Sequence, residues 1–155
     1  MSKTGLEEFH RQTARRCFNE TWDYLDKKDR SANDEQQMLH LVHTARYHQS
    51  FIGTARNFAI GDWQISRVYA AIGEPRLAIH FAKSSLEIME KNNLSDILST
   101  GYEAMARALA IAKDNDSARD YIRKAREQLD KSTVDDEEKK IYLDQIRETE
   151  QLIRE

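Results

Sequence analysis

The chain has 155 residues, with 24 Lys and Arg against 27 Asp and Glu, one Cys, one Pro and five Gly. This length suits one domain or one compact repeat array, and a content of 39% hydrophobic and 33% charged residues excludes both a disordered chain and a membrane-embedded one. The net charge of -3 argues against a dedicated nucleic-acid binder, which usually has a basic excess.

Neither a membrane anchor nor an export signal is visible in the sequence. No apolar run approaches the roughly 18 residues that a membrane-spanning helix needs, and the start of the chain lacks the apolar stretch of a secretory signal. The single Cys17 cannot form an internal disulfide, which fits a reducing compartment. We therefore expect a cytoplasmic protein whose partners include neither a membrane nor a nucleic acid.

The first part of the chain carries two long helical patterns. Apolar residues recur at helical spacing over about residues 6–28 and again over about residues 34–52. The polar stretch between the two patterns predicts a loop, in which Ser31, Asn33 or Asp34 could cap the second helix.

Glycine and proline mark the next helix boundaries. Gly53 is expected to end the second helix, and residues 54–61 are expected to connect it to a third helix that Asp62 caps. Gly73 can adopt the left-handed conformation that ends the third helix, and Pro75 suits the first turn of a fourth.

Three further helices complete the pattern. Apolar spacing predicts helices over about residues 95–109 and 118–129, and Thr133 followed by Asp136 resembles a capping box before a seventh helix over about 134–154. Because no stretch alternates polar and apolar residues with a period of two, the chain is predicted to be all-α.

A pattern of small and aromatic residues occurs twice, 40 residues apart. It begins at Ala78 in one copy and at Ala118 in the other, and small residues there let the two helices of a hairpin approach closely. The pattern resembles the tetratricopeptide repeat, with Tyr69, Gly73 and Ala78 at its aromatic, glycine and alanine positions, although Lys113 stands in the glycine position of the second copy.

This resemblance implies about seven antiparallel helices stacked as tetratricopeptide-like hairpins in an α-α superhelix. The hairpins would span about residues 6–52, 62–91 and 95–130, followed by a capping helix at about 134–154, within one helical-repeat domain. A helix bundle without repeats is the alternative.

Residues from about 39 to 112 also resemble an uncharacterised bacterial protein family. The shared features are a helix with the spacing H-x4-H at His43 and His48, a G-T loop at residues 53–54, and the segment G-x-W-x-x-S-R-V-Y at residues 61–69. The resemblance implies a cytoplasmic helical-repeat protein and no established activity.

Two histidines of the second helical pattern have the spacing of metal ligands on one helix face. His40 and His43 share a helix face, but one turn earlier that face offers only Gln36, a poor zinc ligand. His48 lies about 140° around the helix from His43, so these two cannot share one ion. We therefore predict no metal and no cofactor, and interpret the histidines as a polar face with one packed ring.

No catalytic residue is predicted. The sequence contains no Walker loop, no Rossmann glycine fingerprint, no G-x-S-x-G elbow and no CxxC pair. Cys17 falls on the apolar stripe of the first helix beside Phe18 and Trp22, which predicts a buried, inert thiol.

Four residues on consecutive hairpins form the strongest candidate binding set. Trp63 precedes Arg67 by one helical turn, and Glu103 precedes Arg107 by the same interval. The first helices of tetratricopeptide hairpins line a concave face, where two guanidinium groups and an aromatic ring could hold a carboxylate. The competing hypothesis is that Glu103 pairs with an arginine and ties adjacent hairpins together.

Two functional hypotheses follow. The first is a non-catalytic scaffold that binds a protein or peptide on its concave face. The alternative is a small-molecule or metal-dependent site, catalytic or not, built from His43, His48, Trp63 and Arg67.

Self-association is a further expectation. The first helix carries more apolar surface than one hairpin partner needs, in the residues Phe9, Phe18, Trp22, Tyr24 and Leu25. Such a surplus favours docking against a two-fold copy, so a homodimer is expected.

Overall fold

The computed structural model describes residues 2–154, which form seven α-helices and no β-strand. The helices are α1 (Lys3–Leu25), α2 (Ala32–Ile52), α3 (Ala55–Ala71), α4 (Pro75–Lys91), α5 (Leu98–Ile111), α6 (Asn115–Asp130) and α7 (Asp136–Arg154). The prediction of an all-α fold with about seven helices is confirmed. No helix in the described part of the chain is both long enough and apolar enough to cross a membrane.

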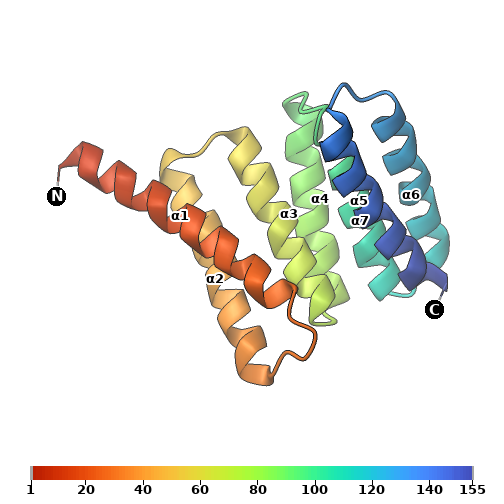
Figure 1. Cartoon of the computed structure of the whole chain (residues 1–155), viewed down its shortest axis with the longest axis horizontal. Coiled ribbons are helices and arrows are strands. Elements are labelled where there is room, and N and C mark those ends of the chain that lie inside the picture. Colours follow the sequence, from red (N-terminus) through yellow and green to blue (C-terminus); the bar gives the residue numbers. More distant parts are fainter. Residues whose placement is uncertain (1, 155) are drawn as a thin grey trace.

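Helical hairpins are the building unit of the fold. α1 packs on α2, α3 on α4 and α5 on α6, and the first helices of successive hairpins also touch, α1 with α3 and α3 with α5. Figure 1 shows the hairpins side by side in chain order, with α7 crossing in front of α5 near the C-terminal end. Because α7 contacts both α5 and α6, it covers a surface that would otherwise face solvent.

The third helix begins earlier than the sequence indicated. α3 starts at Ala55, and at its start the backbone N–H of Thr54 donates to Asn57 Oδ1 at 3.0 Å. Asp62 is not a cap but lies inside α3, where it is buried and accepts hydrogen bonds from side chains of α2 and α4. The connection predicted over residues 54–61 was therefore wrong, because an aspartate typical of helix starts serves here as a buried hydrogen-bond acceptor.

Other helix starts also differ from the predicted ones: α1 begins at Lys3 and α6 at Asn115, each about three residues earlier than expected. α5 begins at Leu98 instead of Ser95, because residues 95–97 form a turn. The residue that caps α7 is Asp135 and not the predicted Thr133. Asp135 Oδ1 accepts a hydrogen bond from the Glu138 N–H at 2.9 Å. Aspartate is the more favoured N-cap residue of the two, which accounts for the shift.

The hairpin turns after α3 and α5 share one local geometry. Gly73 has a φ of 78° and Lys113 a φ of 67°, both in the left-handed region that favours glycine. In each turn this residue's N–H donates to the carbonyl three residues earlier, and the next N–H donates to the carbonyl five residues earlier. Both helices therefore end in a Schellman motif, and Lys113 adopts the conformation of the glycine that it replaces in the repeat pattern.

Small residues allow the helices to approach closely. Ala78 and Ala118, the matching positions of the two sequence copies, are fully buried in the clusters that join α4 and α6 to their neighbours. Ser66 Oγ of α3 donates to the Ala78 carbonyl at 2.8 Å. A Cβ added at Gly101 would lie 2.6 Å from Met89 Sδ, so α4 and α5 pack without room for another carbon.

Candidate functional site

Glu103 on α5 is the buried centre of a polar network. Its side chain is 1% exposed, and its Oε1 accepts hydrogen bonds from Arg107 Nη2 at 2.8 Å and from Thr149 Oγ1 of α7 at 2.6 Å. Arg107 lies one helical turn from Glu103 and also donates to Glu148 Oε2 of α7 at 3.2 Å. The network therefore ties α7 to α5.

Arg67 on α3 lies beside this network but has weaker partners. Its nearest carboxylate oxygen, Glu148 Oε2, is 3.8 Å from Nη2, and its buried Nε and Nη1 have no hydrogen-bond partner among residues 2–154. The guanidinium carbon lies 5.3 Å from the ring centre of Trp22 and 5.6 Å from that of Trp63. These contacts are cation–π interactions with rings of two different hairpins.

The electrostatic environments of the two arginines differ accordingly. Burial and the neighbouring charge of Arg107 lower the pKa of Arg67 to about 10, so the group still carries its charge at neutral pH. Burial also opposes the charge of Arg107, but Glu103 and Glu148 outweigh it and raise the pKa of that guanidinium. Arg67 is thus the cation of the pair with unused hydrogen-bonding capacity.

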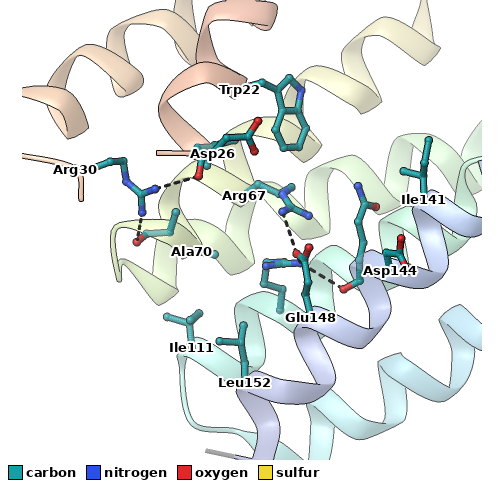
Figure 2. Close-up of a pocket in the computed structure, with 14 residues that line it drawn as sticks. Trp22, Asp26, Arg30, Arg67, Ala70, Ile111, Ile141, Asp144, Glu148 and Leu152 are labelled. Atoms are coloured by element: carbon teal, nitrogen blue, oxygen red, sulfur yellow. Dashed lines mark hydrogen bonds and ion pairs between the residues drawn. The ribbon is translucent and has the colours of Figure 1, made fainter. Parts of the chain in front are cut away.

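A cavity of about 590 Å³ opens beside Arg67. Figure 2 shows its guanidinium between Trp22 and Glu148, with side chains from several helices around it. The walls come from the C-terminal end of α1 and from α3, α5 and α7. They combine three arginines (Arg30, Arg67, Arg107), three acidic residues (Asp26, Asp144, Glu148) and apolar side chains that include Trp22, Leu25, Ile111, Ile141 and Leu152.

Arg30 also lines this cavity, but its guanidinium is bound to backbone carbonyl groups. Its Nη1 donates to the Lys27 carbonyl at 3.0 Å and to the Leu25 carbonyl at 3.2 Å, just after the end of α1. A cation at a helix C-terminus satisfies carbonyl groups that lack an intrahelical partner. Arg30 therefore holds the loop after α1, although its buried Nε has no partner within residues 2–154, and Arg107 is bound to Glu103. Arg67 is the arginine of this cavity with two nitrogens that have no partner in the described part of the chain.

The structure brings together the four residues that spacing placed on consecutive hairpins. Arg67 contacts Trp63, Arg107 binds Glu103, and Glu148 approaches both arginines. Trp63 itself is 7% exposed and does not line the main cavity; Trp22 of α1, 5.7 Å away between ring centres, supplies the aromatic wall.

Three contributors were missed by the sequence analysis. Trp22 comes from α1, and Glu148 and Thr149 come from α7, the two helices for which the sequence predicts an apolar stripe and a capping role. One feature of the sequence could have indicated Trp22. Its helix is the first of a hairpin, and the first helices of successive hairpins line the same face.

The two histidines of the candidate set lie elsewhere. His43 on α2 has its Nε2 2.8 Å from the Tyr69 hydroxyl and its ring edge-on to Phe81, and burial lowers its pKa. His48 pairs with His10 of α1. Neither histidine lines the cavity beside Arg67, so the structure does not unite His43, His48, Trp63 and Arg67 in one site.

Cys17 is buried on α1, as its place on the apolar stripe predicted. Burial raises the pKa of its thiol, which disfavours the reactive thiolate. Residues 2–154 contain no group of three or more His, Cys, Asp or Glu side chains placed to hold a metal ion.

No family model, no curated protein and no solved structure matches the chain.

Proposed function

We propose that this chain is a non-catalytic, tetratricopeptide-like module of the bacterial cytoplasm that binds an acidic protein or peptide segment in the groove between α1, α3, α5 and α7. The observation that carries the proposal is the state of Arg67. Its guanidinium is buried at the edge of an open cavity and still charged at neutral pH, and two of its three nitrogens have no acceptor among residues 2–154.

A carboxylate is the ligand group that fits this environment. A guanidinium presents paired N–H groups that match a carboxylate in a planar, bidentate contact. Leaving a buried donor without an acceptor costs about 1–3 kcal/mol, and a carboxylate that displaces Glu148 and reaches such a donor removes that cost. Because Asp26 and Asp144 line the same cavity, a basic residue next to the acidic one would also find a partner.

A small organic anion is the second candidate ligand. The cavity of about 590 Å³ falls within the usual range for small-molecule sites, roughly 300–1,000 Å³. This candidate relies on Arg67 with Trp22 as the apolar wall, and it leaves out His43 and His48 because neither lines the cavity.

Peptide selection tests the proposal. A phage-displayed random peptide library would be selected on the immobilised full chain, and enriched peptides would be measured by fluorescence anisotropy. We expect enriched peptides to carry Asp, Glu or a free C-terminal carboxylate at a fixed position. Arg67→Gln should weaken their binding by about 10- to 100-fold, equivalent to the ~1.5–3 kcal/mol of a charge-assisted hydrogen bond.

Arg123→Gln is the matched control, because Arg123 lies on α6 with a side chain 62% exposed and lines none of the cavity. Binding that is equal in wild type, Arg67→Gln and Arg123→Gln would contradict the proposal. If carboxylate peptides fail but small dicarboxylates stabilise wild type and not Arg67→Gln in a thermal-shift assay, the second candidate ligand is the correct one.

A further inference from the structure

A second group of interacting side chains lies where α1 crosses α2, outside the cavity beside Arg67. His10 of α1 and His48 of α2 face each other with their Nδ1 atoms 2.8 Å apart and their ring centres 5.0 Å apart. The two residues are 38 positions apart in the sequence, so the helix crossing creates the pair.

Aromatic contacts hold the two imidazole rings in place. Phe51 stacks on His10 with ring centres 4.3 Å apart and an interplanar angle of 7°. Phe9 and Tyr47 meet the ring of His48 edge-on, at 5.8 Å and 5.9 Å. Because Phe9, Tyr47 and Phe51 are themselves exposed, the histidine pair is oriented by packing and still reachable from solvent.

We propose that His10 and His48 form a two-histidine site for a late divalent transition-metal ion, with Cu²⁺ the best fit. Metal–imidazole bonds are about 2.0 Å long. Two adjacent nitrogens of a square-planar ion at that bond length lie about 2.8 Å apart, whereas those of a tetrahedral ion lie about 3.3 Å apart. The Nδ1–Nδ1 separation of 2.8 Å is a hydrogen bond in the metal-free pair, and it also places both nitrogens within reach of one ion. Among divalent first-row ions, Cu²⁺ is the one that such nitrogen ligands bind most tightly.

The proton balance of the site is simple. In the metal-free pair one Nδ1 carries the hydrogen and donates it to the other. Metal binding needs a lone pair on both Nδ1 atoms, so both neutral rings must carry their proton on Nε2. The ring that donates the hydrogen bond therefore loses its Nδ1 proton to water and gains one on Nε2.

Two protein ligands leave the other coordination positions open. Water would fill them, because the structure places no third His, Cys, Asp or Glu at the pair within residues 2–154. The site is therefore a bidentate chelate that links α1 to α2, and it is independent of the proposed binding groove at Arg67.

Copper titration of four variants tests this assignment. Cu²⁺ would be titrated by calorimetry into the full chain and into His10→Ala, His48→Ala, His40→Ala and His80→Ala, with circular dichroism to check that each variant is folded. We expect one equivalent to bind, and affinity to fall by at least the roughly tenfold that loss of an outer-shell partner costs, in His10→Ala and in His48→Ala, since either change leaves a single direct ligand. His40 and His80 are both exposed and lie outside the pair, so their variants should bind as wild type does.

A second measurement on the unmodified chain removes the risk of a misfolded variant. Substoichiometric Cu²⁺ should broaden the NMR resonances around residues 10 and 48 before any others. Broadening that begins at another histidine, or affinity that is equal in all four variants and wild type, would overturn the proposal and leave the pair as an interhelical hydrogen bond.

Discussion

Arg67 and Arg107 are neighbouring cations, but they differ in their partners. Removal of Arg107 would leave a buried carboxylate without its cation, whereas removal of Arg67 would not. Glu103 is 1% exposed and depends on Arg107 for two of its hydrogen bonds. Arg67 has one distant ion pair, at 3.8 Å, with the exposed Glu148. The stability of the protein should therefore respond differently to the removal of each guanidinium.

Arg107→Met should lower the free energy of unfolding by about 3–5 kcal/mol, because it leaves the Glu103 carboxylate buried without its cation. Arg67→Met should change the free energy of unfolding by less than about 1 kcal/mol, or raise it, because it replaces an incompletely paired buried charge with an apolar side chain of similar length. Urea denaturation followed by circular dichroism measures both values.

A double variant provides the control for this comparison. Adding Glu103→Gln to Arg107→Met should recover part of the lost stability, because no buried carboxylate remains. Equal and coupled losses in Arg67→Met and Arg107→Met would instead make Arg67 a structural tie between hairpins and remove the basis of the proposed binding site.

The sequence predicted the parts of the site that are one helical turn apart, and it could not predict the parts that tertiary packing adds. The spacing of Glu103 and Arg107 brings them together on any helix. The contact of Arg67 with Trp22 depends on how α1 lies against α3, and that of Thr149 with Glu103 depends on how α7 packs on α5. Neither packing arrangement leaves a local pattern in the chain.

At the scale of helices, the boundaries marked by special backbone chemistry were predicted best. Gly73 ends its helix with a positive φ, and Pro75 occupies the first turn of α4, as expected. The start of α3 was missed because Asp62 has the chemistry of a cap and the burial of a core residue. Local sequence does not distinguish these two uses of an aspartate.

The turn after α5 offers a stability prediction. Lys113 holds a φ of 67° that costs an L-residue roughly 1 kcal/mol and costs glycine much less. Lys113→Gly should therefore raise the free energy of unfolding by up to about 1 kcal/mol, and differential scanning calorimetry would record a higher melting temperature.

Lys91→Gly is the opposite control, because Lys91 is an exposed residue in the last turn of α4. Glycine in a helical conformation should lower stability there by about 0.5–1 kcal/mol. If both lysine variants have a lower melting temperature than wild type, the left-handed conformation of Lys113 does not destabilise the folded state as expected.

At the scale of the whole molecule, apolar surface remains at the α1–α2 end. Phe18, Trp22, Tyr24 and Leu25 are partly covered by their own chain, but Phe9 is 49% exposed. Leu6, Tyr47 and Phe51 are also exposed large apolar residues of α1 and α2. The homodimer therefore stays a prediction. We now expect the dimer contact in the N-terminal half of α1, where Leu6 and Phe9 are exposed.

Light scattering in the presence of EDTA tests self-association without any metal contribution. We expect the wild type to show a mass between monomer and dimer that rises with concentration, and Phe9→Glu to show the monomer mass throughout, because a buried unpaired carboxylate would oppose docking. Ile141→Glu, an exposed apolar position on α7, is the control and should behave as wild type does. A monomeric wild type at high micromolar concentration would reject the homodimer.

The walls of the cavity beside Arg67 include Leu25 from the first helix and Leu152 from the last. In a stack where each hairpin rests mainly on its neighbours, these two helices have no substantial direct contact and can fray separately. A ligand that contacts both helices would link them. Local unfolding of either α1 or α7 would then require the ligand to dissociate. Hydrogen exchange at the two ends of the chain would then slow together on binding, although α1 and α7 are separated by five helices.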